Sequence, residues 1–111
     1  MMTPGKYSVW FKTPIGEGSG VALLAADGGV SGGDSTFTYL GKWSKAGDRF
    51  KVTLSAKRAI AGPPGVFGMD ELDIVLTGLS DGATGAATGF ARQAPGLKLE
   101  VSFVRIDEAA N

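Results

Sequence analysis

Short runs in which apolar and polar residues alternate are the feature that most constrains the fold of this chain. In the run RFKVTLSAK, residues 49–57, Phe50, Val52 and Leu54 alternate with polar residues. A strand points successive side chains to opposite faces, so this period of two predicts a strand with one buried face. The 18 glycines and five prolines divide the chain into such runs, at the spacing typical of a β-sandwich or β-barrel.

The alternation predicts an all-β fold of seven or eight antiparallel strands. The expected strands are residues 6–12, 17–26, 29–32, 36–44, 49–57, 70–78, 83–93 and 97–106. Asp27 and Gly28 predict a type I′ turn, Pro95 and Gly96 a further turn, and residues 62–65 (GPPG) a loop, because proline cannot donate to a strand ladder. An up-and-down barrel is the most economical arrangement, because closure leaves no strand edge unpaired. A flattened sandwich is the alternative.

The length, charge and missing residue types limit the functions that fit. The 111 residues fit one domain, residues 1–111. The chain carries 11 basic and 11 acidic residues without a basic run, so direct binding to nucleic acid is not expected. It has no cysteine and no histidine, so we expect no catalytic residue, no metal and no cofactor. The longest apolar run, residues 21–26, is too short to cross a membrane, which favours a cytoplasmic protein without a membrane partner.

Two further features favour structural roles over catalysis. Asp70, Glu71 and Asp73 form a carboxylate cluster, but a strand points Asp70 and Glu71 to opposite faces, so we expect solvated charges. The glycine-rich run GVSGGD, residues 29–34, lacks the Lys-Ser/Thr and the helix that follow in a phosphate-binding loop. A turn capped by Asp34 is the prediction there. An enzyme is therefore not expected.

Six stretches, taken in order, give the chain a family resemblance. They are GKYSVWF, GSGVALL, DGGVSGGDSTFTYLGKW, VFGMDEL, LTGLSDG and APGLKLEVSF, which together extend from Gly5 to about Arg105. On these residues the chain resembles the GrlR-like family, named for a negative regulator of type III secretion in attaching-and-effacing bacteria. The most specific part of the match is the turn Gly32, Gly33 and Asp34, followed by Tyr39 and Gly41.

The resemblance implies a lipocalin-like antiparallel barrel, a homodimer and an apolar interior cavity. The named member of that family binds a transcriptional activator through an exposed acidic patch and holds it away from DNA. In this chain the corresponding residues 44–48 keep one acidic residue, Asp48. The resemblance therefore supports the fold and the cavity more strongly than it supports the same protein partner. The implied function is a non-enzymatic regulatory protein that binds another protein.

Four apolar residues on faces expected to point outward are candidates for a protein contact or a homodimer seam: Trp10, Val21, Leu23 and Leu40. A regulatory binding module would use such a patch to recognise a transcriptional regulator or a second copy of the chain. The alternatives are that these are scattered surface residues or that their side chains point into the barrel and not outward.

The interior of the expected barrel favours a second function, that of a lipocalin-like carrier or sensor of a small hydrophobic molecule. Rows of glycine and alanine within residues 16–22 and 83–91 place little volume inside. A cavity there would be rimmed by Tyr7, Phe11, Phe37, Tyr39, Trp43, Phe50 and Phe103. The alternative is that these aromatic rings face the small residues and fill the lumen, and the packing density of protein interiors favours a filled or nearly filled barrel.

Overall fold

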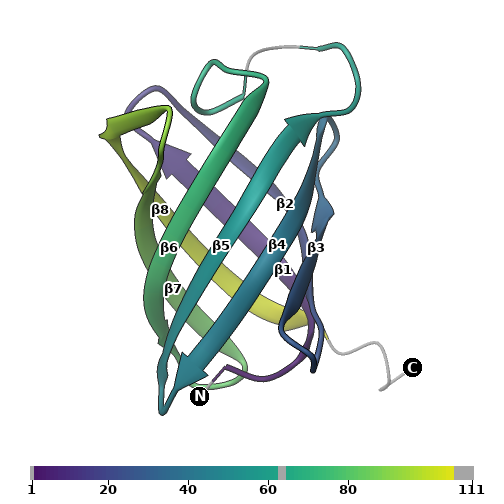
Figure 1. The fold of residues 1–111 in the computed structure, drawn as a ribbon, viewed down its shortest axis with the longest axis vertical. Coiled ribbons are helices and arrows are strands. Elements are labelled where there is room, and N and C mark those ends of the chain that lie inside the picture. The colour runs from purple at the N-terminus through teal and green to yellow at the C-terminus, as the bar shows by residue number, and fades with distance from the viewer. Residues whose placement is uncertain (1, 63–64, 107–111) are drawn as a thin grey trace.

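The chain folds into a closed antiparallel β-barrel (Figure 1). The structure, a computed structural model, describes residues 2–62 and 65–106. The strands are β1 (Gly5–Thr13), β2 (Gly16–Leu24), β3 (Gly29–Gly33), β4 (Phe37–Ala46), β5 (Arg49–Arg58), β6 (Glu71–Ser80), β7 (Thr84–Ala91) and β8 (Ala94–Ile106). Each strand pairs with the next, and β8 pairs with β1. The predicted up-and-down barrel is confirmed, with eight strands among the residues that the structure describes. In this described part of the chain, no helix is long and apolar enough to span a membrane.

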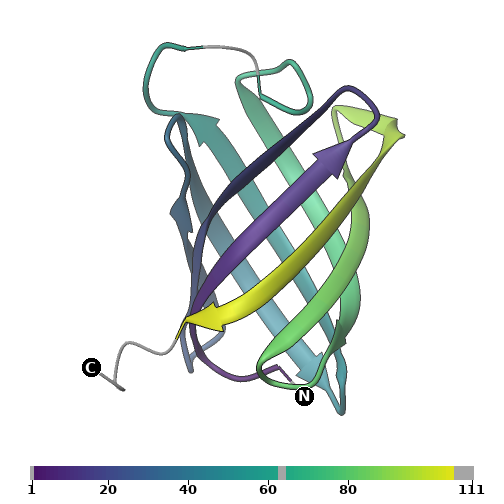
Figure 2. The ribbon, with the colours of Figure 1, turned by 180° about the vertical axis from the view of Figure 1, so that it is seen from behind.

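The first and last strands close the barrel. Tyr7 pairs with Arg105, and Phe11 pairs with Val101. Figure 2 shows β1 in purple with β2 on one side and β8, in yellow, on the other. Strand β1 therefore has a hydrogen-bonded neighbour on both sides. Because the first and last strands pair with each other, the sheet closes and encloses an interior.

Alternation along the strands sets the inside of the barrel. In β5, Phe50, Val52 and Ala56 are buried, while Lys51 and Thr53 are exposed, as the period of two predicts. The same pattern on the other strands gathers one apolar core. Its buried members are Met2, Tyr7, Leu24, Val30, Phe37, Trp43, Phe50, Val52, Ala56, Phe67, Leu72, Leu76, Ala87, Ala91, Leu99 and Phe103.

Aromatic rings inside the barrel lie over glycines of the neighbouring strand. Phe11 pairs with Gly18, and a Cβ atom on Gly18 would lie 2.6 Å from Cε2 of Phe11. Phe103 pairs with Gly85 and covers it in the same way. Interior glycines therefore make room for large inward side chains, a role that glycine often has where a sheet coils strongly.

The turn after β2 differs from the sequence prediction. A type I′ turn needs a positive φ at both central residues. Of Asp27 and Gly28 only the glycine has one, with φ at 98°. Strand β2 ends at Leu24, earlier than predicted, and residues 25–28 form the loop to β3.

The predicted turn at Pro95 and Gly96 is wrong, because both residues lie within β8. The chain reverses earlier, between the paired residues Ala91 and Ala94. Proline is tolerated at this position because the ladder between β8 and β1 begins only at Glu100. The missing N–H of the proline therefore removes no hydrogen bond from that ladder.

The end of the barrel that holds the N-terminus in Figure 1 is closed by side chains. Trp43 is 9% exposed, and its indole Nε1 donates a 2.9 Å hydrogen bond to the carbonyl oxygen of Ala25. Met2 is buried there, and its carbonyl oxygen accepts a hydrogen bond from Nζ of Lys45. These contacts hold the N-terminal segment and loop 25–28 against the end of the barrel.

At the opposite end, the connection between β5 and β6 turns over the barrel (Figure 1). Phe67 in this connection is buried in the core. The hydroxyl of Thr13 donates to the carbonyl oxygen of Val66, which ties the connection to the end of β1. The predicted loop at residues 62–65 falls between β5 and β6, and residues 63–64 lie outside the described part of the chain.

Candidate functional site

The barrel encloses a cavity of about 440 Å³ that is partly open to solvent. This volume lies in the range of small-molecule sites, about 300–1,000 Å³. The expectation of a filled or nearly filled lumen is therefore wrong. The inner wall is largely apolar, and its aliphatic part includes Val9, Val52, Leu54, Leu72, Ile74, Leu76, Leu99 and Val101.

Three of the rings that line the cavity pack together at the closed end of the barrel. Tyr7 and Phe103 meet edge to face with ring centroids 5.5 Å apart, and Phe50 meets Phe103 at the same distance. The wall also includes small residues, such as Ala22, the register partner of Tyr7, and Ala87, the register partner of Val101. These small side chains add little volume to the interior, which leaves room for the cavity.

The aromatic residues predicted to rim the cavity lie in it with one exception. Tyr7, Phe11, Phe37, Tyr39, Phe50 and Phe103 all line it. Trp43 is buried but lies outside the lining, because its indole is held at the closed end by Ala25. The aliphatic lining residues were missed as site residues, although they occupy inward positions of the alternation. That period alone was a sufficient signal to find them.

Exposed lining residues, among them Glu17 and Ser19, mark an opening of the cavity where β3 is too short to cover β2. Strand β2 pairs with β1 from Gly16 to Leu24, but its pairing with β3 begins only at Val21. The turn from β3 to β4 lies against this segment, since a Cβ atom on Gly20 would lie 3.1 Å from Cβ of Asp34. The polar lining residues gather along this border, and they are Glu17, Ser19, Asp34, Ser35 and Thr36.

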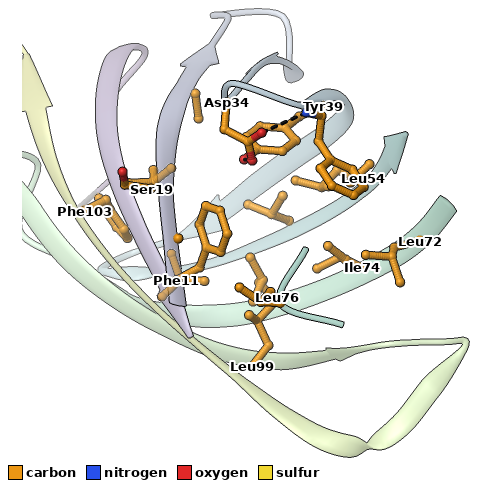
Figure 3. Close-up of a pocket in the computed structure, with 18 of the residues that line it drawn as sticks. Phe11, Ser19, Asp34, Tyr39, Leu54, Leu72, Ile74, Leu76, Leu99 and Phe103 are labelled. Carbon is orange, nitrogen blue, oxygen red and sulfur yellow. Dashed lines mark hydrogen bonds between the residues drawn. The ribbon is translucent and has the colours of Figure 1, made fainter. Parts of the chain in front are cut away.

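Asp34 and Tyr39 lie side by side at this opening (Figure 3). The Tyr39 hydroxyl donates a 2.6 Å hydrogen bond to Oδ2 of Asp34. The backbone amides of Thr36 and Phe37 donate to Oδ1 at 2.9 and 2.8 Å, so Asp34 caps the turn as predicted. Burial raises the pKa of Asp34, but the hydrogen bonds from Tyr39, Thr36 and Phe37 together lower it by more. The net pKa is below the ordinary value of 3.8, so Asp34 is a carboxylate at neutral pH.

Tyr39 is held in its neutral form. Burial raises the pKa of its hydroxyl above the ordinary value of 10.0, and the hydrogen bond to the Asp34 carboxylate raises it further. The proton of Tyr39 therefore stays on the hydroxyl and points at Asp34.

The two glycines before Asp34 permit close backbone contacts. Gly32 has a φ of 137°, and a Cβ atom there would collide with the carbonyl oxygen of Val21. A Cβ atom on Gly33 would lie 2.5 Å from the carbonyl oxygen of Phe37. The turn Gly32, Gly33 and Asp34 thus forms the tight connection that ends β3 early and borders the opening.

The candidate interface residues point outward. Trp10, Leu23 and Leu40 are 47%, 44% and 70% exposed, and Val21 is half-buried. The alternative of an inverted facing is therefore wrong for these positions. Leu40 is nevertheless separate from the others, because β3 lies between β2 and the strand β4 that carries it.

Several of these residues share one surface. Val21 on β2 and Val104 on β8 both pair with Ser8 of β1, and the next row adds Leu23 and Ile106. We call this surface the outer apolar face, and it consists of Trp10, Val21, Leu23, Val104 and Ile106. It crosses β2, β1 and β8, which run side by side in Figure 2.

The carboxylates at the start of β6 are engaged with neighbouring side chains. Oδ1 of Asp70 accepts a 2.7 Å hydrogen bond from Nε of Arg58. Oδ2 of Asp73 accepts a 3.0 Å hydrogen bond from the amide of Gln93. Within residues 2–62 and 65–106, no group of three histidine, cysteine, aspartate or glutamate side chains is arranged to hold a metal ion.

No protein-family model matches the chain, and no curated protein is significantly similar to it. The resemblance to the GrlR-like family therefore stays a prediction from the residues that carry it. We base the functional proposals on the cavity and on the outer apolar face.

Proposed function

We propose that the chain is a non-enzymatic binding protein that holds one small apolar or amphipathic molecule inside its barrel, as a carrier or sensor. The observation that carries this proposal is the cavity of about 440 Å³ with its aliphatic and aromatic wall. Removing apolar ligand surface from water contributes roughly 25 cal/mol per Å², so such a wall favours an apolar guest. A binding role is also supported by the absence of histidine and cysteine from the sequence, since these residues serve most often as general bases and nucleophiles.

The shape of the cavity sets the orientation of the bound molecule. The rings of Tyr7, Phe50 and Phe103 fill the closed end, so the apolar part of a ligand lies between them and the opening. Leu54 and Leu76 project into this middle region in Figure 3. A polar group on the ligand then lies at the border between β2 and the β3–β4 turn, where water reaches it.

A titration with the neutral fluorescent probe N-phenyl-1-naphthylamine tests the proposal. Val101 lines the cavity, so Val101→Phe places a ring where the ligand lies. Val104 is on the same strand but 43% exposed, so Val104→Phe is a matched control. We expect saturable binding of one probe per wild-type or Val104→Phe chain, and affinity weakened by about tenfold or more in Val101→Phe, which is about 1.4 kcal/mol. Equal affinity in the two variants, or no saturable binding by the wild type, would contradict the proposal.

We propose a second function, regulation through a protein contact, on the basis of the outer apolar face. Trp10 lies on this face diagonally from Val21 and Val104, which pair with Ser8. Tryptophan is enriched among the residues that dominate binding energy at interfaces. The partner is a second copy of the chain or a cytoplasmic transcriptional regulator, as the resemblance implies. Affinity capture from the native cytoplasm tests this function. Recovery of a transcription factor in stoichiometric amount supports regulation of transcription. Recovery of the chain alone contradicts a transcription-factor partner and leaves self-association as the only contact of this face.

A further inference from the structure

The polar part of the cavity wall carries charge of one sign. Among the described residues, the lining includes the acidic residues Asp34 and Glu17 and contains no lysine or arginine. The sequence has no histidine that would add a positive charge. A ligand group that lies at the opening therefore meets a negative potential, and the low-dielectric wall behind it strengthens that field.

The Asp34–Tyr39 pair is arranged to accept a hydrogen bond. Oδ1 of Asp34 is occupied by the amides of Thr36 and Phe37. In the described part of the chain, Oδ2 accepts one hydrogen bond, from Tyr39. A carboxylate oxygen has two lone pairs, so Oδ2 keeps one acceptor position. Tyr39 directs its single proton to Asp34, so this pair accepts from a ligand and does not donate to it.

Two cations near this end of the barrel are paired with other acids. Nε of Arg58 lies 2.7 Å from Oδ1 of Asp70. Lys12 is the register neighbour of Glu17 on β1, and its Nζ lies 3.8 Å from Oε2 of Glu100. Neither cation lines the cavity, so the negative charge of Asp34 at the opening is left for a ligand to balance.

We infer that the molecule held in the barrel is a cationic amphiphile, whose apolar body fills the lumen and whose ammonium group lies against the carboxylate of Asp34. This inference rests on the proposed ligand-binding function. An ammonium group supplies both the positive charge and the N–H donors that Oδ2 of Asp34 accepts. A fatty acid or an alkyl phosphate would place its anion beside Asp34 and Glu17, where like charges repel.

A series of ligands with one tail and three head groups tests the inference. Dodecylammonium, dodecanol and dodecanoate are used to displace N-phenyl-1-naphthylamine from the wild-type protein at neutral pH and low salt, below their micelle concentrations. We expect dodecylammonium to displace the probe at a concentration about tenfold lower than dodecanoate, with dodecanol between them. Equal potency of the three, or tightest binding of dodecanoate, overturns the inference and leaves the binding function standing. No binding of the probe or of any of the three overturns the binding function itself.

Two aspartate variants test which carboxylate causes the preference for dodecylammonium over dodecanoate. Asp81 caps the β6–β7 turn with the same pattern as Asp34, because its Oδ1 accepts from the amides of Ala83 and Thr84, but it lies outside the cavity lining. We expect Asp34→Asn to remove most of the preference for dodecylammonium over dodecanoate while dodecanol binds as in the wild type. We expect Asp81→Asn to keep the preference. A preference that survives in Asp34→Asn overturns the assignment to Asp34.

The wild-type protein supplies a test that does not depend on a variant folding. Salt screens charges at a partly exposed opening. The ratio of the affinity for dodecylammonium to the affinity for dodecanoate should therefore fall toward one as the ionic strength rises from about 0.01 to about 1 M. The affinity for dodecanol should not fall with it. A ratio that does not change with salt overturns the inference.

Discussion

The ring of Phe103 lies over the backbone of Gly85 on the neighbouring strand, and the two residues are register partners across β7 and β8. Phe103 is buried and also contacts the rings of Tyr7 and Phe50 at the closed end of the barrel. The glycine therefore sets how deeply the ring seats, and with it the depth of the cavity.

Gly85→Ala should destabilise the fold. The added Cβ atom would collide with the Phe103 ring and would lie 2.5 Å from the carbonyl oxygen of Leu79. Overpacking of this kind costs about 1–3 kcal/mol. Urea denaturation followed by circular dichroism measures the free energy of unfolding. Gly96→Ala is the control, because nothing lies within 4 Å of its Cβ position, and we expect its stability to be unchanged or higher by up to about 1 kcal/mol. Equal effects of the two substitutions would contradict the packing of Phe103 on Gly85.

Trp43→Phe should also destabilise the fold. The substitution removes the 2.9 Å hydrogen bond to the carbonyl oxygen of Ala25 and part of a buried ring. The expected loss is about 1–3 kcal/mol. Trp10→Phe is the matched control, because Trp10 is an exposed residue, and we expect a change within about 0.5 kcal/mol. If the two variants unfold at the same urea concentration as the wild type, Trp43 does not hold loop 25–28.

Stability should depend on the charge of Asp34 in acid. The pKa of Asp34 is lowered in the folded state, because its hydrogen bonds outweigh the effect of burial. A lowered pKa means that the carboxylate contributes stability above the unfolded value of 3.8, and that this contribution is lost as the pH falls through the folded value. Asp34→Asn should therefore be less stable than the wild type at neutral pH, and the gap should close as the pH falls below about 4. Urea denaturation from about pH 6 to about pH 2 measures the gap, and a constant gap would show that Asp34 is not stabilised as an anion.

Trp10→Ala should weaken self-association if the outer apolar face joins two chains. A tryptophan at the centre of an interface contributes about 2–4 kcal/mol as a hot spot, which would shift the dimer to monomer at micromolar concentration. Sedimentation equilibrium measures the shift. Leu40→Ala removes an even more exposed side chain from a separate strand, β4, and should leave the association unchanged. A monomeric wild type, or a dimer that both variants leave intact, would rule out this face as the dimer interface.

Period-two alternation predicted the barrel and the inward faces, because strand geometry fixes which side chains share a face. The alternation in residues 49–57, for example, identified Leu54 as an inward residue, and Leu54 lines the cavity. Whether inward residues enclose space was not predictable in this way. It depends on how the side chains pack in three dimensions, as for Phe103, whose ring packs against Tyr7 and Phe50, and for Trp43, which lies outside the lining.

The opening was also beyond sequence reasoning, for a different physical reason. It arises because the β2–β3 register begins only at Val21, while β2 extends back to Gly16. Register depends on the whole set of cross-strand contacts, and a single sequence does not show it. The capping role of Asp34 was predictable from turn chemistry, but its contact with Tyr39 requires the β3–β4 turn to be placed in space.

Intermolecular NOEs between bound N-phenyl-1-naphthylamine and the methyl groups of the wild-type protein test the central claim most directly, because they locate the ligand. The account predicts cross-peaks from the probe to Leu54, Leu76 and Leu99, which line the cavity. Cross-peaks to the exposed methyl groups of Leu40 and Val104, with none to the interior leucines, would contradict it.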